Sequence, residues 1–362
     1  MTVYIIFLFL FILSSYLEVI HHKHYNWWWI VIFFAIIIVG FRYEVGSDWA
    51  GYVSYYDKNR YDTWNTIVNG EFEPMYMILM LFSKALGFNS QVFLTLFSSI
   101  SIGVLIIAIK RLCGSYYCTS FLLYYCLHFF QFQFNMIRHG MAASFIVLSI
   151  YYVYKHEKKK FLLCILIAFL FHKTAIPFVC LYFFDRFNLS KIRMLFLGVC
   201  AGLIYIYVSV SGLLDALPLF QDKIDYYLYD YYGGHIEDFA YGISLGLLFL
   251  CFLSFFARFG PTKSFYDDDN LYKVLVNIAF VAFLISVSFN QIPIIVERYV
   301  SILNTVIIIL FPYLFYGFKN NKKRFVLWSF IIIYCVLLFS KNLAINPETK
   351  TNQFIPYKMR II

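Results

Sequence analysis

Long apolar runs recur along this chain of 362 residues, and short polar segments separate them. A helix needs about 20 apolar residues to cross the roughly 30 Å hydrocarbon core of a bilayer. Runs of suitable composition are Val3–Ile20, Trp27–Phe41, Val92–Ile109, Tyr116–Phe134, Ile137–Tyr154, Met194–Ser211, Tyr241–Ala257, Lys273–Phe289, Val300–Phe318 and Phe325–Phe339. Because lipid offers no partners to backbone N–H and C=O groups, these runs predict helices. We expect an all-α, polytopic transmembrane bundle with about 10–12 membrane segments.

The composition supports one integral membrane domain over residues 1–362. Charged residues make up 14% of the chain and hydrophobic residues 62%, whereas a soluble domain carries roughly 25% charged residues. The net charge of +9 does not indicate nucleic-acid binding, because the basic residues gather in short clusters between apolar runs. The eight cysteines form no CxxC motif, so neither a metal site nor a disulfide framework is predicted.

The basic clusters predict which loops lie in the cytoplasm, where lysine and arginine are enriched. On this rule residues 155–160, 258–272 and 319–324 are cytoplasmic. Counting crossings from these clusters places the loop 212–240 on the extracytoplasmic side, and the acidic residues of the loop 42–74 indicate the same side for that loop.

Two apolar runs do not fit this count. Phe161–Phe184 must leave the cytoplasmic side and return within 24 residues, although two full spans need about 40. We therefore predict a broken or re-entrant hairpin that turns near Phe171–Thr174, with Pro177 just after. For Met75–Leu86 the alternatives stay open: either this run is not a full span, or Lys110-Arg111 is an exception to the charge rule.

Ionisable residues at the ends of these runs are the candidate functional residues, because charge within a membrane is costly unless it is paired or solvated. Five places qualify, and the predicted topology puts all five on the extracytoplasmic side. They contain Arg42, Asp48 and Tyr52; Glu73; Arg138 and His139; His172; and Glu297 and Arg298.

Four of these places also have a structural alternative. Arg42 can be a snorkelling arginine with a local ion pair to Asp48 through the turn at Gly46. Glu73 can cap a helix dipole, and His172 can be a hydrogen-bonded core histidine. Glu297 and Arg298 can form a structural pair.

Arginine and histidine together favour a site for an anionic substrate. The guanidinium stays charged and its planar fork of donors suits phosphate oxygens. Histidine titrates near neutral pH and can act as a general base. No P-loop, HExxH or GxSxG motif is present, and the acidic run Asp267–Asp269 is interpreted as a solvated charge run in a cytoplasmic loop rather than a metal site.

These places, in order, resemble the EpsG-like group of Wzy-type bacterial oligosaccharide repeat-unit polymerases. The first motif is Phe41-Arg42-Tyr43 with Gly46, Asp48, Tyr52 and then Glu73. The others are Ile137-Arg138-His139-Gly140-Met141-Ala142, Ile167-Ala168-Phe169-Leu170-Phe171-His172-Lys173-Thr174-Ala175, and Glu297-Arg298-Tyr299. His139 departs from the glutamine that many members carry there.

The resemblance implies a GT-C-like glycosyltransferase of the bacterial inner membrane, with its active site facing the periplasm or cell exterior. Such enzymes move a glycan from undecaprenyl pyrophosphate to a newly flipped lipid-linked repeat unit, as in O-antigen or capsule synthesis. The implied partners are the lipid-linked donor and acceptor, membrane lipid and, optionally, a chain-length regulator; no cofactor, metal or nucleic acid is implied.

Our hypothesis for the site assigns the donor pyrophosphate to Arg138, Arg298 and Arg42. His139, Glu297 and Tyr52 complete the substrate-binding set. His172 is the first candidate for the base that deprotonates the acceptor hydroxyl, with Asp48 and Glu73 as rivals. An O-antigen ligase that uses the same carrier is the closest alternative, and a flippase or exporter of lipid-linked oligosaccharides is a more distant one.

Overall fold

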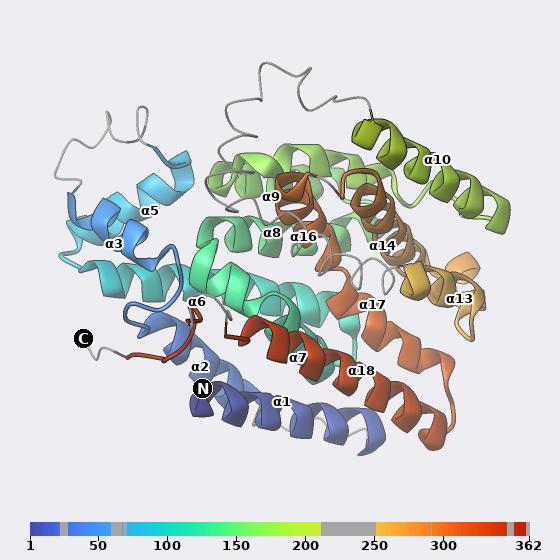
Figure 1. The fold of residues 1–362 in the computed structure, drawn as a ribbon, viewed down its shortest axis with the longest axis horizontal. Helices are drawn as coiled ribbons and strands as arrows, with labels where there is room; N and C mark the ends of the chain where they lie inside the picture. The colour runs from blue at the N-terminus through green and yellow to red at the C-terminus, as the bar shows by residue number, and fades with distance from the viewer. Residues whose placement is uncertain are drawn as a thin grey trace. The chain divides into compact units, whose positions relative to one another are not determined.

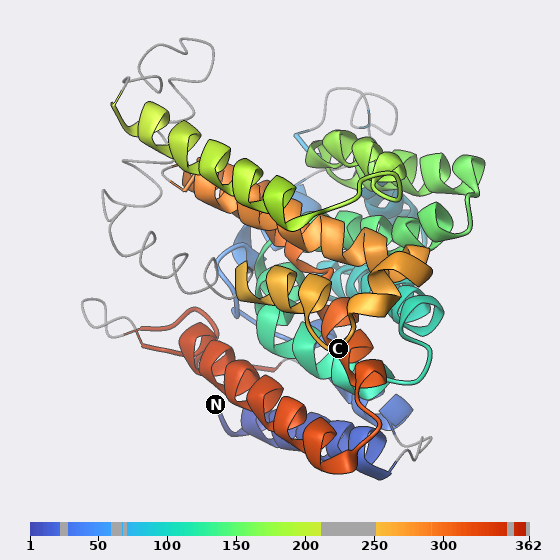
Figure 2. The ribbon, with the colours of Figure 1, turned by 90° about the vertical axis from the view of Figure 1, so that its right-hand side faces the viewer.

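The computed structural model describes residues 1–21, 28–58, 67, 71–210, 251–290, 292–345 and 351–359 (Figures 1 and 2). Within these ranges the regular elements are helices, and β-pairing is confined to two isolated bridges, Arg42–Met359 and Asn352–Ile355. The predicted loop 212–240 lies outside the described residues, as do residues 59–66 and 68–70 of the predicted loop 42–74.

The chain divides into two compact units. Unit 1 comprises Met1–Val179 and Phe311–Ile362, and unit 2 comprises Cys180–Leu310. The predicted loop sides and the single domain are not tested by this division and stay predictions.

Unit 1 contains the longest apolar helices of the N-terminal half together with the last helix. Its elements are α1 (Thr2–His21), α2 (Trp28–Gly40), α3 (Trp49–Lys58), α5 (Pro74–Ala85), α6 (Ser90–Cys113), α7 (Tyr117–Leu127), the π-helical turn η1 (Gln131–Asn135), α8 (Ile137–Tyr154), α9 (Lys158–Phe171), η5 (Phe315–Gly317) and α18 (Asn321–Asn342). Helix α8 packs between α6 and α9, while α1, α7 and α18 pack against one another (Figure 1).

Unit 2 contains α10 (Lys191–Val210), α13 (Lys263–Asp268), α14 (Asn270–Ser288), α15 (Pro293–Ile295), η4 (Val296–Val300) and α16 (Ser301–Asn304). The 3₁₀ helix η2 (Lys173–Phe183) and helix α17 (Ile307–Leu314) contain the boundaries between the units. Helices α10 and α14 pack side by side (Figure 2). Asp269, from the acidic run, caps α14 by accepting from the Leu271 and Tyr272 N–H groups.

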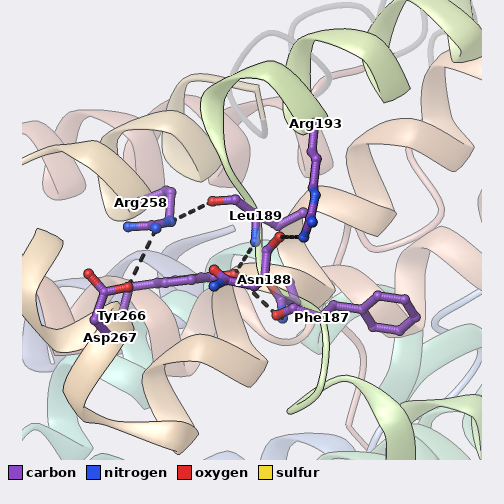
Figure 3. Close-up of polar contacts among 8 residues, drawn as sticks. Phe187, Asn188, Leu189, Arg193, Arg258, Tyr266 and Asp267 are labelled. Carbon is purple, nitrogen blue, oxygen red and sulfur yellow. Dashed lines mark hydrogen bonds and ion pairs between the residues drawn. The ribbon is translucent and has the colours of Figure 1, made fainter.

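A polar network holds the turn before α10 against the start of α14 (Figure 3). The Tyr266 hydroxyl accepts from the Leu189 N–H at 2.8 Å and donates to Asn277 at 2.8 Å. Arg258 donates from Nε to the Leu189 carbonyl at 2.8 Å and lies over the Tyr266 ring. The turn at Leu189 therefore meets the predicted cytoplasmic segment 258–272 within unit 2.

Five of the described helical stretches are long and apolar enough to cross a membrane. They are Thr2–His21, Ser90–Cys113, Asn270–Ser288, Val296–Gly317 and Asn321–Asn342. Shorter apolar helices are Pro74–Ala85, Tyr117–Leu127 and Lys173–Phe183. The predicted all-α, polytopic membrane bundle is confirmed, whereas the number of segments and the GT-C likeness stay predictions.

The predicted break in Phe161–Phe184 occurs at His172. Helix α9 ends at Phe171, and His172 has extended backbone angles, φ −158° and ψ 123°. The chain then continues as the 3₁₀ helix η2, which contains Pro177. Proline lacks the N–H that an α-helix would use there, so the helix does not resume its α geometry across this residue.

The position of α5 bears on the two alternatives for Met75–Leu86. Its first turn follows Glu73, which pairs with Arg138 at the start of α8. Its far end leads directly into α6, where Gln91 donates to the Arg42 carbonyl at 3.0 Å. Both ends of α5 therefore lie at the same end of unit 1, and its 12 residues extend only about 18 Å. This length is shorter than the roughly 30 Å hydrocarbon core, and whether α5 crosses the membrane stays open between the two alternatives.

Candidate functional site

The polar residues of unit 1 gather at its two ends. We call the end that carries Arg42, Glu73, Arg138 and His172 the arginine end. Helix α6 runs from this end to the opposite one, which we call the lysine end. The lysine end carries Lys110, Arg111, Lys155, Lys158, Lys159 and Lys160. At this end Arg111 of α6 donates to the Tyr152 hydroxyl of α8 at 2.6 Å.

Arg138 and Glu73 form an ion pair at the arginine end, although 65 positions separate them in the chain. The two side chains are 19% and 8% exposed, so water screens the pair little. Glu73 occupies the N-cap position of α5, but its carboxylate makes no capping bond. Its second oxygen instead accepts from the Lys173 N–H at 3.4 Å. The carboxylate thus joins Arg138 to the break beside His172, and helix capping does not explain this residue.

Aromatic rings surround the Arg138 guanidinium. Its central carbon lies 4.1 Å from the centre of the Phe72 ring and 5.9 Å from that of Tyr76. The Tyr52 hydroxyl is a further hydrogen-bond partner, and Tyr55 packs on Phe72 at 4.3 Å between ring centres. Ring faces attract cations, so this cradle holds the guanidinium in one orientation.

Arg42 is completely buried, so it is not a snorkelling side chain. Its guanidinium donates to the Val39 carbonyl at 2.9 Å and to the Phe134 carbonyl at 3.4 Å. In the part of the chain that the structure describes, no carboxylate lies within ion-pair distance of it. The predicted turn at Gly46 forms with φ +94°, but Asp48 accepts from the Ser47 hydroxyl instead of pairing with Arg42.

The rings of His139 and His172 meet edge to face, with their centres 4.9 Å apart. His139 is completely buried in α8. The Nδ1 of His172 accepts from the Thr174 N–H at 3.3 Å and lies 2.9 Å from the Thr174 hydroxyl. A ring nitrogen that accepts a hydrogen bond carries no proton, so a neutral His172 carries its proton on Nε2.

The start of α8 is placed by an irregular backbone. The π-helical turn η1 and the non-helical Met136, with φ −78° and ψ 60°, separate α7 from α8. A Cβ at Gly140 would collide with the Phe132 carbonyl, so only glycine allows this close approach. Such π-helical turns often occur at functional sites, and this one presents Arg138 and His139 together.

Glu297 and Arg298 belong to unit 2, where both lie half-buried within η4. The backbone of η4 is π-helical, as is that of η1. Arg298 lies within η4, and Arg138 lies at the start of α8 just after η1. Each of these two arginine motifs therefore lies in or beside a π-helical turn. Their predicted convergence with the residues of unit 1 stays a prediction.

Sequence reasoning missed three contributors to the arginine end. Phe72 directly precedes Glu73 in the sequence, but nothing marked its ring as the support of Arg138. The Lys173 N–H has no signal in the sequence beyond the break itself. The segment 351–359, which pairs with Arg42 and its neighbours, follows the last apolar run and carries no motif.

A metal site is not apparent at either end. Within the described ranges, no group of three or more His, Cys, Asp or Glu side chains is placed to hold a metal ion. The arginine end offers positive charge, fixed donors, one histidine pair and the carboxylates of Glu44, Asp48, Glu71 and Glu73.

Comparison with known proteins identifies one relationship. The sequence profile of the EpsG family matches residues 25–359, nearly the whole chain. No curated protein and no solved structure matches it. The matched region contains both arginine motifs, the histidine break and the acid Glu73. The chain therefore belongs to the EpsG family, a family of membrane proteins related to the Wzy-like polymerases.

Proposed function

We propose that this chain is a repeat-unit polymerase that transfers a glycan from a lipid pyrophosphate to a lipid-linked acceptor. In this reaction the bond between the anomeric carbon and the pyrophosphate oxygen breaks, and a glycosidic bond to an acceptor hydroxyl forms. The lipid pyrophosphate leaves as an anion, and the hydroxyl proton passes to a base. We further propose undecaprenyl as the carrier lipid and the extracytoplasmic side of the inner membrane as the place of reaction.

The observation that carries this proposal is the junction made by Glu73. One carboxylate contacts Arg138 and the N–H beside His172, so it fixes a cation and a histidine from separate helices at one place. Arg138 keeps 19% of its side chain exposed, which leaves part of the guanidinium open to a ligand. Preorganised charge of this kind stabilises an anion as it develops, without having to rearrange during the reaction.

Buried Arg42 supports an anionic substrate independently. Burial of a charge without a counter-charge is strongly unfavourable, and the two backbone carbonyls offset it only in part. A pyrophosphate bound near the arginine end would add the missing negative charge. Its affinity would then include the field of Arg42 even without a direct contact.

The hydrogen bonds of His172 change our assignment of roles within the site. Because Nδ1 is occupied by Thr174, the Nε2–H of a neutral ring is suited to donate to a pyrophosphate oxygen. Glu73 is engaged by Arg138, so Asp48 becomes the proposed base for the acceptor hydroxyl. Arg298 and Glu297 are proposed to join the substrate-binding set on the strength of the family motif.

The test compares two arginines of unit 1 in a strain that lacks the chromosomal copy. Arg138→Ala, at normal membrane level, should replace long polysaccharide ladders with single repeat units. The loss should be about 10²–10³-fold, by analogy with the removal of one preorganised donor. Arg111→Ala at the lysine end is the matched control and should give normal ladders.

The same strain separates the alternatives. A ligase predicts that deletion leaves the acceptor with no glycan at all, whereas a polymerase predicts single-unit caps. Normal ladders from Arg138→Ala, or undecorated acceptor after deletion, would contradict the proposed function.

A further inference from the structure

The segment 351–359, which we call the strap, lies along the arginine end of unit 1 beside α2 (Figure 1). Its backbone pairs with the turn that carries Arg42. Met359 bridges Arg42 in antiparallel fashion, and the Tyr43 N–H donates to the Lys358 carbonyl at 3.0 Å. The Gly46 N–H donates to the Gln353 carbonyl at 2.8 Å. The strap thus contacts both ends of the turn.

The strap is also anchored in the apolar bundle. Phe354 is buried against the rings of Phe130 and Phe134, at 5.2 and 5.8 Å between ring centres. Its carbonyl accepts from the Tyr4 hydroxyl at 3.1 Å, and the Tyr357 hydroxyl donates to the Ile38 carbonyl at 2.9 Å. These contacts to α1, α2 and the region of η1 give the strap a defined position.

Asn135 connects the strap to the two segments that carry Arg42 and Arg138. Its Nδ2 donates to Gln353 Oε1 at 3.1 Å, and its Oδ1 accepts from the Ser47 N–H at 3.0 Å. Asn135 is only 3% exposed and ends η1, immediately before the start of α8 that carries Arg138. One amide therefore joins the strap, the Arg42 turn and the Arg138 helix.

We propose that the strap is a positioning element of the polymerase site, and that Gln353 and Asn135 are positioning residues that set the Arg42 turn against the start of α8. This inference rests on the proposed function. Neither residue is proposed to touch the substrate. Gln353 contacts Asn135 through its side chain and Gly46 through its backbone carbonyl. The segments that carry the two arginines are therefore both held by one residue.

The expected consequence is a loss of catalysis without a loss of fold. A displacement of the arginines by about 1 Å costs about 10²-fold in a site that depends on orientation. Gln353 is exposed, so replacing its side chain removes little buried surface. We expect Gln353→Leu to reduce polymer per molecule of protein about tenfold or more, with unchanged membrane level and unfolding temperature.

Two variants on the strap separate positioning from simple support. Gln353→Glu keeps an oxygen that accepts from Asn135 and should restore the ladders. Lys358→Ala removes an exposed side chain of the same strap while leaving its backbone pairing intact, and should match the unaltered protein. Equal polymer per molecule for Gln353→Leu and the unaltered protein would overturn the proposal, as would a loss that falls in step with protein level.

A second measurement tests the contact without relying on activity. In the full-length protein carrying Asn135→Cys and Gln353→Cys, a short thiol-reactive cross-linker should join the two positions, because the two native side chains meet at 3.1 Å; the product is detected as linked peptides by mass spectrometry. A protein carrying Asn135→Cys and Lys358→Cys is the control for random pairing. If the Asn135→Cys and Gln353→Cys pair forms no more linkage than this control, the proposed position of the strap is wrong. If Arg138→Ala keeps normal ladders while the linkage forms, the proposed function is wrong, and the positioning role is wrong with it. If Arg138→Ala has defective ladders but Gln353→Leu has normal ones, only the positioning role of the strap is refuted.

Discussion

The arginine end and the lysine end of unit 1 both carry basic residues and both terminate membrane helices, yet their basic residues lie in opposite surroundings. At the arginine end, Arg42 is fully buried and Arg138 is bound by a carboxylate from a distant segment. At the lysine end, Lys160 pairs with Glu157 three positions away, and both side chains are exposed. Lys155 and Arg111 lie over tyrosine rings of α8 at that end.

The difference separates exposed charge at a helix end from buried charge that is paired with a distant segment. Exposed lysines at a helix end are solvated, and their location follows the side of the membrane on which they remain. A buried cation must be compensated, and long-range partners are kept only where they are required. The lysine end is explained by topology alone, whereas the arginine end is not.

The largest expected effect concerns the side of the membrane. Single cysteines introduced as Glu71→Cys and Lys159→Cys occupy exposed positions at the two ends. A maleimide that cannot cross the membrane should label the first in intact cells and the second only after the membrane is opened. Labelling of the unaltered protein, with its eight cysteines, sets the background. If both positions react in intact cells, the two ends do not face opposite compartments.

The next largest difference between the two ends should appear in polymer formation by variants of the residues proposed for proton transfer and for the leaving pyrophosphate. Asp48→Asn should lower polymer formation about 10²–10⁴-fold, the usual contribution of a general base. His172→Ala should cause a loss of similar order through the leaving pyrophosphate. His156→Asn at the lysine end is the control, because His156 has φ +55° and asparagine tolerates that conformation. Full activity of Asp48→Asn with loss in His172→Ala would return the base role to His172.

A stability difference should follow from the two ion pairs. Glu73→Gln leaves Arg138 mostly buried without its carboxylate, and should lower the free energy of unfolding by about 3 kcal/mol. Glu157→Gln breaks an exposed pair, which is screened by water, and should leave stability unchanged. Denaturant unfolding in one detergent would compare the two variants. An equal effect of both would mean that burial does not separate the ends.

The smallest effect tests whether burial or location matters. Glu44 and Lys358 lie at the arginine end but form an exposed pair at 2.7 Å. The hydrogen bond and charge of Lys358 hold the pKa of Glu44 below its ordinary value of 4.5. A carboxyl with a lowered pKa adds stability above its ordinary value, and that contribution is lost as the pH falls through the lowered one.

This pair should therefore behave like those of the lysine end. Thermal unfolding of the unaltered protein and of Lys358→Ala should differ only slightly at neutral pH, and the difference should vanish in acid or high salt. A large difference that persists in high salt would show that the pair belongs with the buried charges.

Local composition was sufficient for much of the fold. The apolar runs predicted the membrane class and the helices, because hydrophobic length is a property of consecutive residues. The break at His172 was predicted from the short length of Phe161–Phe184, and α9 does end at Phe171. Family membership was predicted from ordered motifs and is confirmed over residues 25–359.

The candidate site was predicted only as a set of residues. Nothing in the spacing indicated that Glu73 binds Arg138 while also accepting from Lys173, or that Asp48 accepts from Ser47 instead of pairing with Arg42. The sequence also did not show that Thr174 occupies the Nδ1 of His172, which moved the proposed base to Asp48.

The sequence by itself determined that this is a membrane protein of the EpsG family with arginines and histidines at its helix ends. The tertiary structure decided which of those charges are compensated, and that residues 351–359 reach the Arg42 turn. The physical reason is range. Helix formation and membrane burial depend on neighbouring residues, whereas pairing of a charge or an amide depends on segments brought together only when the bundle packs.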